Sequence, residues 1–293
     1  MPQALHIIFA GTPAFAVPSL ELLAADSAFV IDLVITQPDE PVGRKQIVTP
    51  PPVKLAAEHL NLPIWQPKNI NKEFGQRPAA NVPRPDLLIV VAYGQILSLD
   101  VLAWPSVAPI NVHASLLPRW RGASPIQHAI LSGDTETGVT VQRMVQELDA
   151  GPIFGSASTS VAPRETFASL HDRLATMGAT LLVQTVKQLP EPNAQSTSGI
   201  TVCRKLTRAD GQVEPEKMTA AEIDRTVRSL VPWPGVRMKI GDEEVKILET
   251  AVAAAPEAMP ISCKEKSTLY VLRMQSTGGK PMSGVEWMRG HTQ

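Results

Sequence analysis

The chain contains 293 residues, of which 44% are apolar and 19% are charged. This composition supplies a hydrophobic core and excludes an intrinsically disordered protein, and the length favours two domains. The 27 basic residues nearly balance the 28 acidic ones, for a formal net charge of −1. This balance excludes a generally basic nucleic-acid coat protein or an acidic tail protein, but it allows a local basic patch.

Two further features of the sequence bear on the compartment. The two cysteines, Cys203 and Cys263, are too few for a disulfide framework or a zinc site, so we interpret them as free thiols in a reducing cytosol. The first residues lack the basic start and long apolar stretch of a signal peptide. The longest apolar runs, such as residues 87–93, are far shorter than the roughly 20 residues of a membrane helix. We expect a soluble, cytoplasmic protein with no membrane partner.

Short apolar runs alternate with helix-length segments through the first two-thirds of the chain. We predict strands at residues 5–10, 29–36, 86–93 and 108–113, and helices at residues 14–25, 52–60 and 124–132. Continuous apolar runs bounded by Gly, Pro or Asp are typical of strands that are buried on both faces. The alternation therefore predicts an α/β fold, with a doubly wound, mostly parallel sheet covered by helices on both sides.

The pattern changes after a long helix predicted at residues 165–189, where Leu170, Leu174 and Met177 begin an apolar stripe at helical spacing. The next segment is polar, contains proline and has no period, so we interpret residues 190–205 as a linker. A helix at 220–231 and short strands at 236–240, 245–250 and 268–274 predict a small β-barrel or sandwich. The predicted domains are therefore residues 1–189 and 206–293.

The strongest candidate for chemistry follows the predicted strand at 108–113. Asn111 and His113 are two residues apart, so their side chains lie on the same face, at the strand end where parallel sheets bind ligands. An amide can donate to a developing oxyanion, and an imidazole can move a proton. From spacing alone, however, the structural interpretation is favoured, in which Asn111 caps a turn and His113 is a histidine of the core.

Asp149 is the candidate for a third group, which would orient the imidazole and stabilise its charged form. It lies in the sequence Leu-Asp-Ala-Gly-Pro after a strand predicted at residues 138–144. The structural alternative is a carboxylate that stabilises a local turn.

Other motifs carry less information. Gly11-Thr12-Pro13 is neither a dinucleotide-binding fingerprint nor a phosphate-binding loop, although a helix N-terminus there could hold a polar ligand. Residues 37–46 form a partly basic segment that could also be a plain solvated loop. The six histidines are scattered without metal-ligand spacing, so we expect no metal site.

Taken together, these residues resemble a known family. Asn-x-His, then Ser-Leu-Leu-Pro with a glycine four residues later, and the later Leu-Asp-x-Gly-Pro are similar to the folate-dependent formyltransferases. Six blocks together resemble the members that act on methionyl-tRNA: IIFAGTPAFAVPSL at 7–20, TQPDEPVGRK at 36–45, PPVK at 51–54, VAYGQIL at 91–97, NVHASLLPRWRGASPIQ at 111–127 and GKPMSGVEWMRG at 279–290. The resemblance covers essentially the whole chain.

The resemblance implies transfer of a formyl group from 10-formyltetrahydrofolate to the α-amino group of methionine on initiator methionyl-tRNA. It implies a Rossmann-like domain followed by an OB-like barrel, and it makes Asn111, His113 and Asp149 the catalytic trio. The implied folate contacts are Ser115, Leu116, Leu117, Pro118, Phe15, Val91, Ala92, Tyr93 and Gly94. The implied tRNA-reading loop spans residues 37–49 and includes Arg44 and Lys45. We further expect a monomer.

The hypothetical mechanism assigns one role to each member of the trio. Asn111 donates to the oxygen of the tetrahedral intermediate, protonated His113 stabilises that oxygen electrostatically, and Asp149 keeps His113 charged and can relay the amine proton through water. Beside this trio we expect a positive rim formed by Arg44, Lys45, Arg119 and Arg121.

Several alternatives remain open at this stage. A formyltransferase that acts on glycinamide ribonucleotide is a shorter single domain, whereas one that acts on an amino sugar is similar in size. A non-catalytic RNA-binding protein would make no use of the trio and would need more positive charge. A dehydrogenase on the same fold is disfavoured because the glycine fingerprint is missing.

Overall fold

The structure is a computed structural model that describes residues 4–43, 45–78 and 84–291. The chain forms two compact units that are not continuous in sequence. The first contains Met1–Arg121, Thr137–Thr159 and His171–Val202, and the second contains Gly122–Glu136, Ser160–Leu170 and Cys203–Gln293. Within the described ranges, no helix combines the length and the apolar content needed to cross a membrane.

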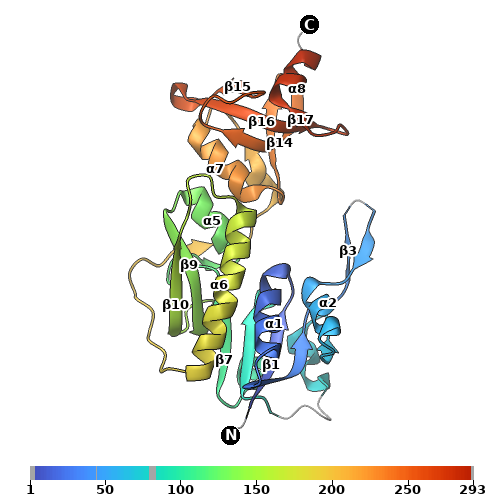
Figure 1. Cartoon of the computed structure of the whole chain (residues 1–293), viewed down its shortest axis with the longest axis vertical. Helices are drawn as coiled ribbons and strands as arrows, with labels where there is room; N and C mark the ends of the chain where they lie inside the picture. Colours follow the sequence, from blue (N-terminus) through green and yellow to red (C-terminus); the bar gives the residue numbers. More distant parts are fainter. Residues whose placement is uncertain (1–3, 44, 79–83, 292–293) are drawn as a thin grey trace. The chain divides into compact units, whose positions relative to one another are not determined.

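A seven-stranded sheet forms the centre of the first unit (Figure 1). Its order is β10 (Ile153–Ser160), β9 (Glu136–Arg143), β7 (Ala108–His113), β6 (Leu87–Val91), β1 (Leu5–Gly11), β2 (Phe29–Ile35) and β5 (Ile64–Trp65). The strands from β5 to β7 are parallel to their neighbours, and β9 runs antiparallel to β7. The predicted α/β fold with a large, mostly parallel sheet is confirmed.

Helices cover both faces of this sheet because its strands are apolar on both sides. On one face, α3 (Ile70–Glu73) and α4 (Leu99–Leu102) pack in a cluster with side chains of β1, β2 and β6. On the other face lies α6 (Phe167–Gln188), whose Gly178 comes so close to Val112 of β7 that a Cβ there would lie 2.9 Å from its Cγ1. Two further helices, α1 (Val17–Ala24) and α2 (Pro52–His59), pack against each other.

The order of the strands defines where a ligand is expected. From β1 the chain proceeds to β2 and β5 on one side, and then to β6 and β7 on the other. The switch point between β1 and β6 is where open α/β sheets bind ligands, outside the carboxyl ends of the strands. Hydrogen bonds connect the segments that follow β1, β2 and β6 at this point. The carbonyl of Tyr93, after β6, accepts from Thr12 Oγ1, after β1, at 2.8 Å and from Gln37 Nε2, after β2, at 3.2 Å.

The second unit is built on a smaller sheet, with strand order β12 (Gln212–Val213), β13 (Val236–Ile240), β14 (Glu243–Ala251), β16 (Thr268–Ser276) and β15 (Met259–Ser262), and with β17 (Met282–Ser283) beside β16. The helices α5 (Pro125–Ser132), α7 (Ala220–Leu230) and α8 (Gly284–His291) belong to this unit. A reciprocal capping box between Thr219 and Glu222 starts α7. Among the described residues, no pairing of β12 with β15 closes the sheet, so a closed barrel is not observed.

A buried carboxylate stabilises this unit. Asp224 of α7 is 3% exposed and accepts hydrogen bonds from Arg164, Arg228 and Thr250, at 2.7, 2.8 and 2.9 Å. Arg228 also donates to the carbonyl of Glu165 at 2.7 Å. The network therefore joins the segment before α6 to α7 and β14, and it satisfies a charge that would otherwise be costly to bury.

The predicted linker has little regular structure, but it is attached to the molecule along its length. Asn193 exchanges two backbone hydrogen bonds with Ile153, at 2.7 and 2.8 Å. Further along, β11 (Val202–Cys203) pairs with β8 (Arg121–Gly122). Composition predicts a linker here, whereas the attachment depends on partners that are distant in sequence.

Candidate functional site

The antiparallel register between β7 and β9 brings four polar side chains to one face. Asn111 is opposite Gln142 and His113 is opposite Thr140, whereas Val112 and Val141 between them point to the other face. Val112 contributes to the core under α6. The apolar side chains of β7 therefore pack in the core, and its polar side chains face the candidate site.

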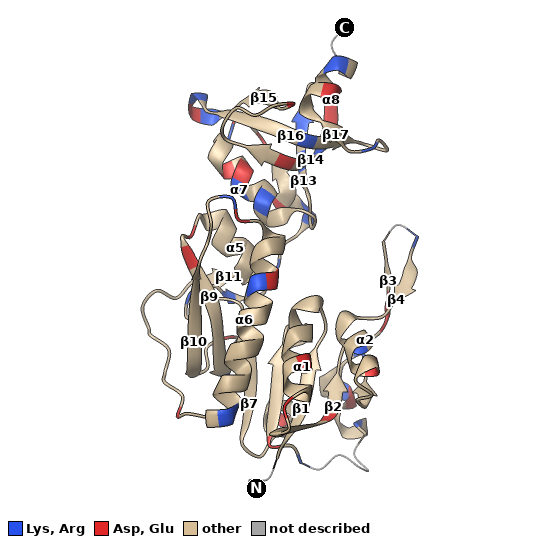
Figure 2. Cartoon of the chain, viewed as in Figure 1, with Lys and Arg blue, Asp and Glu red and all other residues tan. Residues whose placement is uncertain are grey.

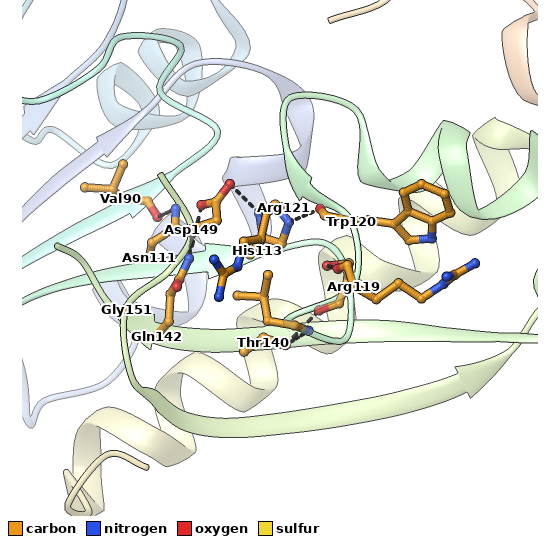
Figure 3. Close-up of polar contacts among 12 residues, drawn as sticks. Val90, Asn111, His113, Arg119, Trp120, Arg121, Thr140, Gln142, Asp149 and Gly151 are labelled. Atoms are coloured by element: carbon orange, nitrogen blue, oxygen red, sulfur yellow. Dashed lines mark hydrogen bonds and ion pairs between the residues drawn. The ribbon is translucent and has the colours of Figure 1, made fainter. Parts of the chain in front are cut away.

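The two ring nitrogens of His113 have different partners (Figure 3). Nε2 lies 2.8 Å from the carbonyl oxygen of Trp120, and Nδ1 lies 3.7 Å from Oδ2 of Asp149. A carbonyl can only accept, so Nε2 carries a hydrogen and Nδ1 is the nitrogen that can gain or lose a proton. The residue is 6% exposed, so this arrangement is largely shielded from water.

Asp149 is held in a tight turn after β9. Its φ of 51° lies in the left-handed region, which aspartate tolerates better than most residues. At Gly151 a Cβ atom would lie 1.8 Å from the carbonyl oxygen of Arg143, so only glycine fits. The motif Leu-Asp-Ala-Gly-Pro therefore encodes a turn that aims the carboxylate back at β7.

Gln142 connects Asn111 and Asp149, two members of the trio. Its Nε2 donates to Oδ1 of Asp149 at 3.1 Å and to Oδ1 of Asn111 at 3.3 Å (Figure 3). Asn111 in turn donates from Nδ2 to the carbonyl of Val90 at 3.0 Å, which fixes the orientation of its amide. The structure thus brings the predicted amide, imidazole and carboxylate together at the end of β7.

The predicted folate contacts after β7 form a tightly bonded loop. Ser115 is fully buried, its hydroxyl donates to the carbonyl of Arg119 at 2.6 Å, and its own carbonyl accepts from Thr140 at 2.7 Å. Leu117 is buried, and its backbone N–H donates to Thr140 Oγ1 at 3.2 Å. Leu116 and Pro118 are partly exposed. These bonds fix the backbone, and the partly exposed side chains remain accessible to a ligand.

The predicted contacts at the end of β6 present mainly backbone. Val91 is fully buried, and the Tyr93 side chain packs in the core cluster under α3 and α4. Burial raises the pKa of the Tyr93 phenol above its ordinary value, so the phenol stays neutral and does not transfer protons near pH 7. Ala92 and Gly94 are exposed and have φ values of 48° and 92°.

Phe15 precedes α1 and is also buried. Its ring packs edge-to-face against His171 of α6, with the ring centroids 5.4 Å apart.

The predicted tRNA-reading loop is a hairpin of β3 (Glu40–Val42) and β4 (Ile47–Thr49). Arg44 lies outside the described residues, and Lys45 is exposed in the turn. The hairpin also exposes three apolar side chains: Val42, Ile47 and Val48. At its base, Asp39 accepts from Gln66 at 2.8 Å and Lys54 at 2.7 Å, and these bonds lower the pKa of its carboxyl.

Two of the arginines predicted to form a positive rim are used inside the first unit. The guanidinium of Arg119 lies 4.4 Å from the centre of the Trp120 ring. Arg121 donates to Gln195 at 3.1 and 2.8 Å, and its side chain is only 12% exposed. In the part of the chain that the structure describes, no group of three His, Cys, Asp or Glu residues could hold a metal ion.

Sequence reasoning missed three contributors to the site. Gln142 could have been found from the predicted strand at 138–144, where Thr140 and Gln142 alternate with Val139 and Val141. The carbonyl of Trp120 and the amide of Gln195 have no comparable pattern in the sequence. Both contribute only because the loops that carry them fold back toward the trio.

Family models match two parts of the chain. The model described as "Formyl transferase" matches residues 5–186, and the one described as "Formyl transferase, C-terminal domain" matches residues 205–292. The chain is 42% identical to a methionyl-tRNA formyltransferase of Halorhodospira halophila, over 98% of this chain and 97% of that protein. The identity to the enzyme of Paracoccus denitrificans is also 42%, with the same two shares. The chain belongs to the methionyl-tRNA formyltransferase family.

Solved structures with a similar fold include other formyltransferases. An N-formyltransferase from Helicobacter canadensis, in complex with folinic acid and dTDP-3-aminofucose, has a TM-score of 0.68 and 17% identity over 90% of this chain and 98% of that one. A methionyl-tRNA formyltransferase from Clostridium thermocellum has a TM-score of 0.59 and 14% identity over 96% and 100%. At these identities the likeness shows the fold alone.

The candidate site can be placed on the matched segments. The trio lies inside the first matched segment, and Gln195 lies between the two segments. A residue from between the two segments therefore contacts the turn that carries Asp149.

The carbonyl of Trp120 predicts one tautomer for neutral His113, with the hydrogen on Nε2. By contrast, His128 has its Nδ1 2.8 Å from the carbonyl of Ser124, so its neutral form should carry the hydrogen on Nδ1. Nitrogen-15 chemical shifts of the labelled protein at alkaline pH distinguish the two forms, and His128 serves as the internal reference. A hydrogen on Nδ1 of neutral His113 would contradict the geometry.

Proposed function

We propose that the chain transfers the formyl group of 10-formyltetrahydrofolate to the α-amino group of methionine on initiator methionyl-tRNA, for translation initiation. The observation that carries this proposal is the convergence of Asn111, His113 and Asp149 at the carboxyl end of β7, beside the switch point of the sheet. Relatives at 42% identity named as methionyl-tRNA formyltransferases support the choice of acceptor.

Asn111 stabilises the oxyanion. When the neutral amine attacks the formyl carbon, the carbonyl oxygen becomes negative. The amide nitrogen of Asn111 carries two hydrogens, and Val90 takes one of them at 3.0 Å. The second is directed at the substrate oxygen by an amide that is already oriented, so little reorganisation is needed in the transition state.

His113 and Asp149 act as a pair. In the reaction the bond from the formyl carbon to N10 of the folate breaks, the bond to the methionine nitrogen forms, and one proton passes from that nitrogen to N10. Nε2 of His113 is hydrogen-bonded to the carbonyl oxygen of Trp120. The pair therefore exchanges protons through Nδ1 and through the Asp149 carboxylate, which lies 3.7 Å from Nδ1. When His113 is protonated, its charge also stabilises the oxyanion.

The residues around the trio fit a folate. The turn after β6 exposes backbone groups at Ala92 and Gly94, where a flat heterocycle can form several hydrogen bonds. Leu116 and Pro118 supply apolar contacts at the opposite loop. We assign Phe15, Val91, Ser115 and Leu117 to the supporting wall because their side chains are buried, and Tyr93 contributes its backbone.

We assign the tRNA contacts to the hairpin of β3 and β4 and to the C-terminal residues 206–293. Basic and acidic residues are interspersed along the chain (Figure 2), so tRNA binding would depend on particular cations such as Arg44 and Lys45. We further propose that residues 206–293 are an OB-like domain, joined by linker 190–205 to a catalytic domain of residues 1–189. The protein would act as a monomer in the cytoplasm.

An acceptor assay tests this function. With 10-formyltetrahydrofolate as donor, the wild-type protein is expected to formylate initiator methionyl-tRNA and to leave glycinamide ribonucleotide and a nucleotide-linked amino sugar unmodified. Formylation of the amino sugar with no product on methionyl-tRNA would overturn the assignment. The comparison with the amino sugar is needed because the fold also occurs in a solved structure described as a sugar 3N-formyl transferase.

Substitutions in the trio test the mechanism. Single-turnover transfer should slow about 10²–10⁴-fold in His113→Ala and Asp149→Asn, because proton transfer is lost. The loss should be about 10²–10³-fold in Asn111→Ala, because an oxyanion donor is lost. His59→Ala and Asp100→Asn change exposed residues of the same types and should keep the wild-type rate. Near wild-type rates in folded trio variants would remove the assigned roles.

A further inference from the structure

Gln195 of the linker is hydrogen-bonded to the turn that carries Asp149. Its Nε2 donates to the carbonyl oxygens of Asp149 and Gly151, both at 2.8 Å, and lies 3.3 Å from Oε1 of Gln142. Its Oε1 accepts two hydrogen bonds from Arg121, at 3.1 and 2.8 Å. One side chain that is 46 residues distant in sequence thus contacts both ends of the turn.

The partners of Gln195 allow only one orientation of its amide. Both backbone carbonyls can only accept, and the guanidinium can only donate. If the amide were rotated by half a turn, Oε1 would face two carbonyl oxygens and Nε2 would face a cation. Arg121 therefore orients the amide, and the amide holds the turn.

The turn is a conformation that needs such support. Asp149 has a positive φ, which costs free energy in a residue other than glycine and persists where surrounding contacts enforce it. Gln142 supports the carboxylate through Oδ1, at 3.1 Å, and Gln195 supports the backbone. Both contacts act on the turn whose carboxylate oxygen Oδ2 lies 3.7 Å from Nδ1 of His113.

We propose that Gln195 is a positioning residue for formyl transfer: its two N–H donors hold the Asp149 turn so that the carboxylate faces His113. The expected effect on the rate of formyl transfer rests on the proposed function, whereas the expected effect on the Asp149 turn does not. The linker is then part of the active-site framework as well as a connection between the two matched segments.

Two substitutions separate this role from a general effect on folding. Gln195→Ala removes every contact of the amide. Gln195→Glu keeps the size and the acceptor for Arg121, but it replaces the N–H donors with an oxygen that repels the two carbonyls and the Asp149 carboxylate. Asn193→Ala is the matched control, because Asn193 is an exposed amide in the same linker that is attached through its backbone.

We expect both Gln195 variants to lower the single-turnover rate about 10- to 100-fold, since a misplacement of about 1 Å in a catalytic group can cost about 10²-fold. The KM for methionyl-tRNA and for the folate should stay within about twofold of wild type, and Asn193→Ala should match wild type throughout. A wild-type rate in Gln195→Glu, or a loss confined to KM, would overturn the proposal. If the alanine variant does not fold, the glutamate variant decides.

Hydrogen–deuterium exchange supplies a readout that does not require activity. The peptide covering residues 145–152 should exchange faster in both Gln195 variants than in Asn193→Ala and wild type, because the turn has lost its two donors. Unchanged exchange would contradict the positioning role of Gln195 even if activity fell. If the Gln195 variants exchange faster but the wild-type protein formylates no methionyl-tRNA, the positioning role stands and only the proposed function is overturned.

Discussion

The pairing of β7 with β9 is the constraint on which the site depends. Antiparallel register places Asn111 opposite Gln142 and His113 opposite Thr140, while the valines between them point toward the core. Shifting this register by one residue would exchange the two faces and bury the polar groups against apolar packing. The same hydrophobic alternation that stabilises the sheet therefore also determines the arrangement of the proposed catalytic groups.

Two neutral amides contribute to the orientation of the Asp149 carboxylate and its turn. Asp149 accepts from the amide of Gln142, and Gln195 lies between its backbone and the guanidinium of Arg121. These amides fix the geometry without supplying a charge of their own. The Trp120 carbonyl plays the corresponding part for the imidazole.

Local patterns predicted most of the first sheet and the placement of the trio's first two members. The strand at 108–113 and the helix at 220–231 could be predicted because their apolar patterns extend over only a few consecutive residues. β10 was missed because its residues Gly155, Ser156 and Ser158 interrupt any apolar run. The linker's attachment through Gln195 was not predictable, since its partners are set by tertiary folding and a lone glutamine in a polar segment carries no periodic signal.

The central claim is that the trio surrounds one formyl carbon. A crystal structure with the unreactive analogue 5-formyltetrahydrofolate tests it most directly. The account predicts that the pterin contacts the backbone at Ala92–Gly94 and that N10, to which the transferred formyl group is attached in the donor, lies beside Asn111 and His113, with Asp149 still facing Nδ1. A folate bound elsewhere, or an Asp149 carboxylate turned away from His113 in the complex, would contradict it.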